Sequence, residues 1–229
     1  MSRRPLRADV RIQPTEWSGV YSDGSWLYTR NLVPGASVYG ETLHVQDGIE
    51  YRRWDAERSK LAAYLKKGGR IWPFHRTSSV LYLGAASGTT ASHVSDIVAE
   101  GAITAVEIAP RPFRDLVNVA AHRSNLIPIL ADAAHPEQYA SQVGRVSILY
   151  QDIAQRAQTA IFLRNVDFLE SGGTGILMLK ARSADVAAPP SILYGEGTTA
   201  LAGAGMKIME VRALDPFALD HAAIVARRP

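Results

Sequence analysis

The stretch VLYLGAASGTT, residues 80–90, decides the fold, because a short apolar strand runs directly into a loop of very small residues. An amphipathic segment over residues 92–100 follows, so the order is strand, glycine turn and helix. Such a turn presents backbone N–H groups and a helix N-terminus to a ligand. The next apolar run carries Glu107 near its end, about twenty residues after Gly84, where a carboxylate can accept hydrogen bonds from both hydroxyls of a ribose. The sequence therefore predicts a site for a nucleoside-containing cofactor.

The composition of this loop narrows the class of cofactor. The loop lacks the third glycine of a dinucleotide-binding fingerprint, and it has no lysine for a triphosphate. These two absences point away from NAD and ATP, and they favour S-adenosylmethionine.

Outward from the loop, apolar runs alternate with amphipathic segments. We expect helices over residues 91–99, 112–122 and 154–169, and the glycine pair at 172–173 is expected to end the last of them. We expect strands over residues 80–83, 103–108, 126–130, 146–150, 174–179, 207–214 and 222–227. This alternation predicts an α/β fold with a doubly wound, mostly parallel seven-stranded sheet and an antiparallel pair at its end.

The first part of the chain has a different pattern. Residues 1–52 are predicted to form a small N-terminal β domain, and residues 53–229 the cofactor-binding domain. Short strand candidates, separated by glycines, lie over 10–12, 20–21, 26–28 and 41–45. Helical periodicity follows over 55–67.

Positive charge is concentrated in one region of the chain, whose formal net charge is +3. Residues 51–76 carry eight Lys or Arg side chains against two acidic ones; this favours a surface that faces a polyanion, and a solvated helix face is the alternative. The chain has no cysteine, no signal-peptide core behind its first arginines, and no apolar run near the roughly 20 residues of a membrane span. We therefore expect an intracellular, cytoplasmic protein that makes no membrane contact.

Five successive strands are expected to end in Gly84, Glu107, Asp132, Asp152 and Lys180. In open α/β sheets, ligands bind outside the carboxyl ends of the strands, so these residues should converge on one crevice. A single aspartate after a strand is commonly a helix N-cap, but a row of polar strand ends beside a glycine loop favours a functional site.

Two of these strand ends fit the chemistry of methyl transfer to a hydroxyl group. That reaction needs the oxygen held in line, about 3 Å from the methyl group, and it needs no metal. We expect Asp152 to orient the hydroxyl or accept its proton, and Lys180 to stabilise the developing alkoxide. The two side chains would titrate as a coupled pair, so the identity of the base stays open. The histidines lack partners at ligand spacing, and no metal site is expected.

Short motifs along nearly the whole chain carry a family resemblance: NLVPG at 31–35, VYGE at 38–41, YRRW at 51–54, RSKLAA at 58–63, LYLGAASGTT at 81–90, SHVSD at 92–96, DIAQ at 152–155, KARS at 180–183 and DHA at 220–222. Together they resemble the fibrillarin family in its shorter archaeal form. The resemblance implies a class I, Rossmann-like methyltransferase fold and S-adenosylmethionine-dependent 2′-O-methylation of ribose in rRNA and tRNA. It also implies a box C/D guide ribonucleoprotein with a guide RNA, a Nop-domain scaffold protein and a kink-turn-binding ribosomal-type protein.

The resemblance further assigns roles to individual residues. It places the cofactor against Ala85, Thr89, Thr90, Glu107, Asp132, Ala133, Asp152 and Gln155. It gives catalytic roles to Asp152, Lys180 and His221, with Asp220 as an alternative to His221. Arg30 stands where the family commonly has a lysine, and we include Arg30 as a further catalytic candidate. The segment 108–110 replaces an aromatic residue of other members, so another apolar side chain must pack against the adenine.

Two other functions stay open at this point. One is a stand-alone RNA methyltransferase that finds its own target, although the N-terminal β region offers no recognisable RNA-reading module. The other is a structural subunit that keeps the fold without the chemistry, and the set Glu107, Asp152 and Lys180 argues against it.

Overall fold

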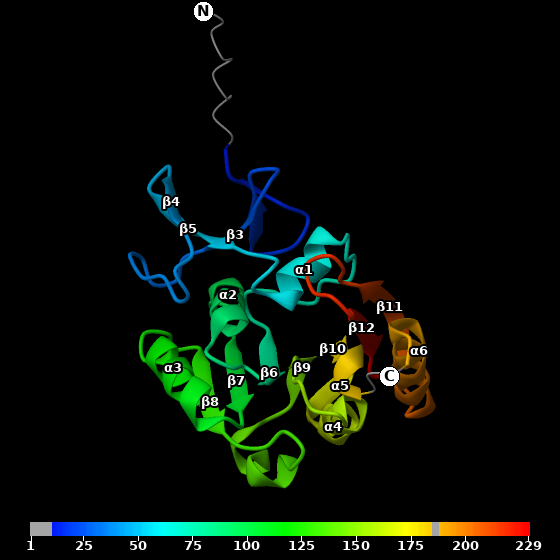
Figure 1. The fold of residues 1–229 in the computed structure, drawn as a ribbon. Helices are drawn as coiled ribbons and strands as arrows, with labels where there is room; N and C mark the ends of the chain where they lie inside the picture. The colour runs from blue at the N-terminus through cyan, green and yellow to red at the C-terminus, as the bar shows by residue number, and fades with distance from the viewer. Residues whose placement is uncertain (1–10, 185–187) are drawn as a thin grey trace, which may run out of the picture.

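Seven strands form a mostly parallel sheet, sheet B, in the computed structural model, which describes residues 11–184 and 188–229 (Figure 1). Along the sheet the order is β11 (Lys207–Ala213), β12 (His221–Arg227), β10 (Leu169–Lys180), β9 (Val146–Gln151), β6 (Ser79–Leu83), β7 (Ala102–Glu107) and β8 (Leu126–Leu130). β12 is antiparallel to both of its neighbours, and the remaining pairs are parallel. The predicted α/β fold, with seven strands and a terminal antiparallel pair, is confirmed.

The strand order reverses between β6 and β9. β6 pairs with β7 on one side and with β9 on the other, while the chain runs outward through β7 and β8 before it returns to β9. Ligands of doubly wound sheets bind at such a switch point. The glycine loop after β6 and Asp152 after β9 border it.

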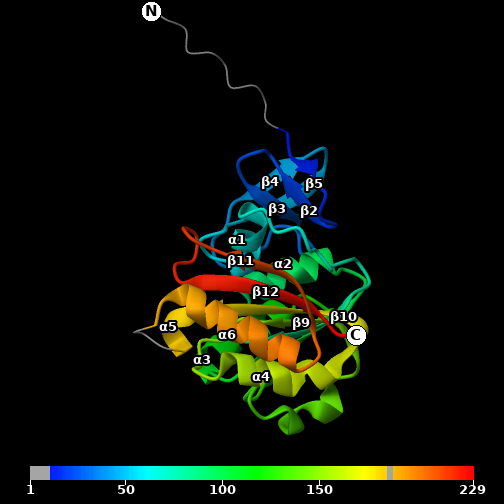
Figure 2. The same cartoon turned by 90° about the vertical axis from the view of Figure 1, so that its right-hand side faces the viewer.

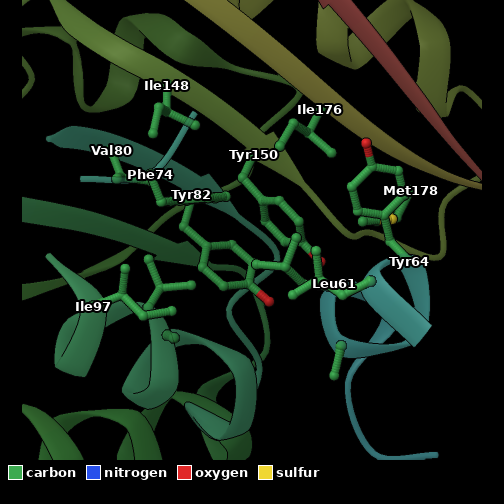
Figure 3. Packing of buried hydrophobic residues seen from close by; sticks show 14 of the residues in the cluster. Leu61, Tyr64, Phe74, Val80, Tyr82, Ile97, Ile148, Tyr150, Ile176 and Met178 are labelled. Atoms are coloured by element: carbon green, nitrogen blue, oxygen red, sulfur yellow. The ribbon is translucent and has the colours of Figure 1, made fainter. Parts of the chain in front are cut away.

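Helices cover both faces of sheet B, as the side view in Figure 2 shows. One face packs against α1 (Lys60–Lys66), α2 (Thr89–Ile97) and α3 (Pro110–Ala120), and the other against α4 (Gln158–Asn165) and α6 (Pro190–Gly203). In Figure 3, Leu61 and Tyr64 of α1 point toward Tyr150 and Met178 of the sheet. Shorter turns lie at α5 (Ala181–Ala184) and, as 3-10 helices, at Pro136–Gln138, Ala140–Gln142 and Val166–Phe168. Within the described ranges, no helix has the length and apolar character needed to cross a membrane.

A second, antiparallel sheet, sheet A, comes first in the chain. Its order is β1 (Gln13–Pro14), β2 (Val20–Ser22), β3 (Leu27–Arg30), β5 (Ile49–Trp54) and β4 (Leu43–Gln46). The sequence did not predict β5. This strand of sheet A continues to Trp54, past the predicted domain boundary at residue 52. The division into 1–52 and 53–229 stays a prediction. The first strand lies at Gln13–Pro14 rather than at 10–12, of which residue 10 lies outside the described residues.

Two predicted helices differ from the structure in their extent. The helix expected over 55–67 begins only at Lys60, because Ser59 is its N-cap and accepts a hydrogen bond from the Ala62 N–H. The helix expected over 154–169 spans only Gln158–Asn165. The residues before it line a cavity described below, and a 3-10 turn follows it.

The glycine pair at 172–173 does not end a helix; it lies inside β10. The register between β9 and β10 shifts between Leu169 and Thr174, and Gly172 has φ +78°. Both glycines bond to the C-terminal segment, since the Gly172 N–H donates to the Arg228 carbonyl and the Arg228 N–H to the Gly173 carbonyl. The pair therefore accommodates an irregularity in the strand, which glycine tolerates without steric cost.

Arg52 does not belong to the predicted basic surface over residues 51–76, because its side chain is 0% exposed. It bonds Glu41 through Nε at 2.7 Å and Asp96 through NH1 at 2.8 Å, and Arg123 bonds the other oxygen of Asp96 at 2.6 Å. We call Glu41, Arg52, Asp96 and Arg123 the buried ion cluster. The cluster connects sheet A to α2. The attraction between its opposite charges offsets the desolvation free energy that burying each charge costs.

Candidate active site

Sheet B brings four of the predicted polar side chains to one edge. Glu107 ends β7, Asp152 follows β9, and Lys180 ends β10. β12 runs in the opposite direction, so its first residue, His221, lies at the same edge and pairs with Lys180. The strand order thus places these residues around the switch point.

A cavity of about 370 Å³ opens at the switch point, between the glycine loop and the segment after β9. Its wall is mostly apolar and includes Ile108, which is 50% exposed. The full lining comprises Gly84, Ala86, Val106, Glu107, Ile108, Ala131, Ala133, Asp152, Ile153, Ala154 and Gln155. A cavity of this size with a few polar groups suits a nucleoside-sized ligand.

Gly84 lets the two sides of the cavity approach each other closely. It has φ +83°, and a Cβ atom there would lie 2.4 Å from the carbonyl oxygen of Asp152. Its N–H donates to the Val106 carbonyl at 2.8 Å, which fixes the start of the loop against β7. Gly88, with φ +90°, is the N-cap of α2 at the other end of the loop. The small residues noticed in the sequence therefore have a steric reason.

Glu107 links the two loops that border the cavity. Its side chain accepts one hydrogen bond from the Ala86 N–H and one from the Ala109 N–H, both at 2.8 Å. The residue is only 8% exposed. Each carboxylate oxygen has a second acceptor site, so the group can still receive two hydroxyl donors. Two backbone N–H groups thus fix the carboxylate in the wall of the cavity.

Of the other predicted cofactor residues, Ala133 and Gln155 line the cavity, and Asp132 does not. Asp132 accepts hydrogen bonds from the Ala134 N–H at 2.9 Å and from Gln155 Nε2 at 3.5 Å. It therefore orders the segment around the cavity rather than lining it.

Three predicted cofactor residues in the glycine loop and α2 do not line the cavity. Ala85 is buried, and Thr90 donates its hydroxyl proton to Ser59 Oγ at 2.9 Å. Thr89 lines a separate groove, together with Ser87 and residues of α3. The structure brings them close to the cavity without placing their side chains in its wall.

Lys60 is a functional candidate that the sequence reasoning missed. Its Nζ lies 2.8 Å from Oδ1 and 3.0 Å from Oδ2 of Asp152. The contact depends on the start of α1, where the cap Ser59 is bonded to Thr90 at the start of α2. The signal that could have found it is the RSKLAA motif, which contains Lys60 next to a helix cap.

Arg30 lies in a different part of the molecule. It is the last residue of β3 in sheet A, is exposed, and pairs across the sheet with Tyr51. Among the described residues, the ion pair of Asp152 is with Lys60 rather than with Arg30 or Lys180. The structure therefore favours Lys60 over Arg30 as the cation beside Asp152.

His221 is held in one tautomer by the backbone. Its Nδ1 lies 2.7 Å from the Leu219 carbonyl oxygen, which can only accept, so Nδ1 carries the proton and Nε2 is left as an acceptor. Burial lowers the pKa of His221, and nearby Lys60 and Lys180 also lower it, against the raising effects of the Leu219 carbonyl and Asp152. The imidazole is therefore predominantly neutral at pH 7.

The predicted alternative, Asp220, has a structural arrangement of its own. Its carboxylate pairs with Arg182, and its carbonyl accepts the Ala181 N–H at 2.9 Å. These bonds join the segments that follow Lys180 and precede His221. In the part of the chain that the structure describes, no cluster of three or more His, Asp or Glu side chains could hold a metal ion.

Comparison with known proteins places this geometry in a family. The family model described as Fibrillarin matches residues 12–229. The chain is 49% identical to a fibrillarin-like rRNA/tRNA 2′-O-methyltransferase of Aeropyrum pernix, over 92% of this chain and 93% of that protein. A protein of the same description from Methanosarcina mazei is 49% identical over 91% of this chain and 93% of the relative.

Solved structures of fibrillarins also match this chain. A fibrillarin pre-rRNA processing protein of Methanococcus jannaschii matches with a TM-score of 0.92 at 39% identity, over 96% of this chain and 98% of that one. Aeropyrum pernix fibrillarin, solved with natively bound S-adenosyl-L-methionine, matches at 0.88 and 48% identity, over 95% and 98%. A fibrillarin/Nop5p complex matches at 0.85 and 41% identity, over 93% and 99%. The chain belongs to the fibrillarin family.

Proposed function

We propose that this protein transfers the methyl group of S-adenosylmethionine to the 2′-oxygen of a ribose in rRNA and tRNA, as the catalytic subunit of a box C/D guide ribonucleoprotein. The observation that carries the proposal is the shared edge of sheet B. There a nucleoside-sized cavity with a backbone-held Glu107 lies directly beside the Lys60–Asp152 ion pair. Membership of the fibrillarin family, whose relatives are described as 2′-O-methyltransferases, supports it.

The residues of the cavity fit S-adenosylmethionine, which when bound supplies an electrophilic methyl group. Glu107 would hold the two ribose hydroxyls, since each of its oxygens has one acceptor site left. Ile108 and Ala133 would pack against the adenine. Asp152 and Gln155 line the part of the wall contributed by the segment after β9, and would flank the methionine portion. Ala85, Thr89, Thr90 and Asp132 would shape the loops around it.

The target hydroxyl would meet the side chains at the carboxyl edge of sheet B. Lys60 holds the Asp152 carboxylate in a fixed direction, so that it can orient the hydroxyl. His221 presents a neutral Nε2 that can accept the hydroxyl proton, and Lys180 would offset the charge that develops on the oxygen. We propose Asp152, Lys60, Lys180 and His221 as the catalytic set, with Lys60 in the role first assigned to Arg30.

The partners follow from the family. A fibrillarin/Nop5p complex supports a Nop-domain scaffold protein as the docking partner of this chain. We propose that a box C/D guide RNA pairs with the target rRNA or tRNA and that a kink-turn-binding protein anchors the guide. We place the assembly in the cytoplasm, without a membrane.

The experiment is methyl transfer from labelled S-adenosylmethionine to a target RNA. It compares the protein alone, the protein with scaffold, kink-turn protein and guide RNA, and the full mixture with a 2′-deoxy target nucleotide. We expect transfer only in the full mixture, and we expect the 2′-deoxy substitution to abolish it.

Each alternative has its own outcome in this experiment. Transfer by the lone protein, with a fixed sequence preference, would indicate a stand-alone methyltransferase. Failure to bind S-adenosylmethionine at all would indicate a structural subunit. Transfer that survives the 2′-deoxy substitution would overturn the assignment of the acceptor atom.

A further inference from the structure

The strand that carries Lys180 extends beyond its neighbour. The last paired residues of β10 and β9 are Leu177 and Gln151, after which β9 ends and the chain turns away to line the cavity. β10 continues to Lys180, which pairs with His221 of β12 on its other side. The backbone of Lys180 that faces β9 therefore has no strand partner, and buried backbone groups require one.

The side chain of Gln158 supplies that partner. Its Oε1 accepts the Lys180 N–H at 2.8 Å, and its Nε2 donates to the Lys180 carbonyl at 3.0 Å. The amide group thus makes the two bonds that the N–H and C=O of one residue in an antiparallel strand would make. Gln158 is the first residue of α4 and is 1% exposed, so its side chain lies away from water.

A second glutamine fixes the first. Gln151, the last residue of β9, is fully buried and donates from Nε2 to the Gln158 carbonyl at 2.8 Å. Gln151 immediately precedes Asp152 in the chain. A continuous run of hydrogen bonds therefore connects the backbone that carries Asp152 to the backbone that carries Lys180.

We propose that Gln158 is a positioning residue for the reaction: it fixes the backbone of Lys180, and so the origin of the Lys180 side chain, relative to the Lys60–Asp152 pair. This inference rests on the proposed role of Lys180. β9 ends at Gln151, because the chain after it lines the cofactor cavity. No neighbouring strand can therefore bond the backbone of Lys180 on this side. Displacement of a catalytic group by about 1 Å can cost a factor of ~10² in rate, so such support affects turnover directly.

The first test is Gln158→Met, which keeps a similar volume and removes both bonds to Lys180. In the reconstituted particle we expect the single-turnover rate of methyl transfer to fall about tenfold or more, with the Kd for S-adenosylmethionine within about twofold of wild type, since Gln158 does not line the cavity. The matched control is Gln46→Met. Gln46 bonds both backbone groups of Ile12, at 2.8 and 2.9 Å, in sheet A, so it loses the same two bonds away from the site.

A double-mutant comparison separates positioning from general loss of structure. If Gln158 acts through Lys180, then Gln158→Met should slow a Lys180→Met enzyme no further. The inference is overturned if Gln158→Met reacts at the wild-type rate, if it slows the Lys180→Met enzyme by the same factor, or if Gln46→Met is equally slow. A Lys180→Met enzyme with the wild-type rate would instead overturn the proposed role of Lys180.

A second variant covers the case in which Gln158→Met fails to fold. Gln158→Glu keeps an acceptor for the Lys180 N–H but places a carboxylate oxygen against the Lys180 carbonyl. Protonation would restore a donor there, so we expect the rate relative to wild type to rise as the pH is lowered. A ratio that does not change with pH would contradict the inference.

Discussion

The ammonium group of Lys60 lies 2.8 Å from Oδ1 of Asp152, so the helix that follows sheet A supplies a cation to the strand ends of sheet B. Both side chains are largely buried, at 28% and 16% exposure, and the pair is therefore less screened by water and salt than a surface pair. The contact thus connects α1 to the wall of the cavity at the switch point.

Lys60→Met should reduce the rate of methyl transfer by about 10²-fold, because it removes an electrostatic partner from the catalytic edge. The affinity for S-adenosylmethionine should change little, since Lys60 does not line the cavity. Single-turnover rates and calorimetric titration of the cofactor measure the two effects. The control is Lys66→Met on the same helix, where the exposed side chain bonds the Ser25 carbonyl. Equal rates for Lys60→Met and Lys66→Met would remove Lys60 from the catalytic set.

Glu107→Gln should weaken the binding of S-adenosylmethionine by tenfold or more, because hydrogen bonds to a charged group contribute about 1.5–3 kcal/mol each. The amide replaces an acceptor oxygen by a donor, which then faces either a backbone N–H or a ribose hydroxyl. Titration calorimetry with the isolated protein measures the change. Glu100→Gln, at an exposed pair with Arg76, is the matched control. An unchanged Kd would mean that Glu107 organises the loops without contacting the ribose.

The strand-end residues of the cavity wall were predictable from the sequence for a physical reason. Each parallel strand ends at the same edge of the sheet, so a list of strand-end residues is also a list of neighbours in space. Glu107 and Asp152 needed only the strand boundaries, and these followed from apolar runs that are buried on both faces. The glycine at 84 marked the close approach of two backbones.

The cation beside Asp152 was not predictable in the same way. Lys60 reaches Asp152 because α1 packs on sheet B, a contact between segments 92 positions apart in the chain. Local charge counting gave the wrong answer for Arg52 too, since the residues that compensate it, Glu41 and Asp96, come from other elements. The ion-pair partners of Lys60 and Arg52 are set by the tertiary fold, and the hydrophobic periodicity of a segment does not predict them.

Arg52→Met should lower the free energy of unfolding by about 3 kcal/mol, the cost typical of removing one partner from a buried ion pair. Glu41 would lose its cationic partner, and Asp96 would keep Arg123 as its cationic partner. Urea denaturation at pH 7 measures the change. Arg76→Met, which breaks an exposed pair, should have little effect. Equal stabilities of the two variants would show that the buried ion cluster does not hold sheet A to α2.

His93 lies beside this cluster and is uncharged. It is fully buried, with Nδ1 2.7 Å from Thr29 Oγ1 and Nε2 2.9 Å from the Tyr39 hydroxyl. Burial holds its pKa well below the usual value of 6.5, and Arg52 and Arg123 lower it further. The folded protein therefore resists protonation at this position, while the unfolded chain accepts a proton below about pH 6.5.

The free energy of unfolding should consequently fall as the pH drops below about 6.5, with His93 contributing at most about 1.4 kcal/mol per pH unit. His93→Gln removes the titrating group and should flatten the profile between about pH 6.5 and 5, above the range in which carboxylates titrate. Urea denaturation at several pH values measures the slope for wild type and variant, so that the same-direction contribution of His221 cancels. His75→Gln, at an exposed position, should keep the wild-type slope. A His93→Gln profile as steep as that of wild type would mean that the buried imidazole does not set the acid sensitivity.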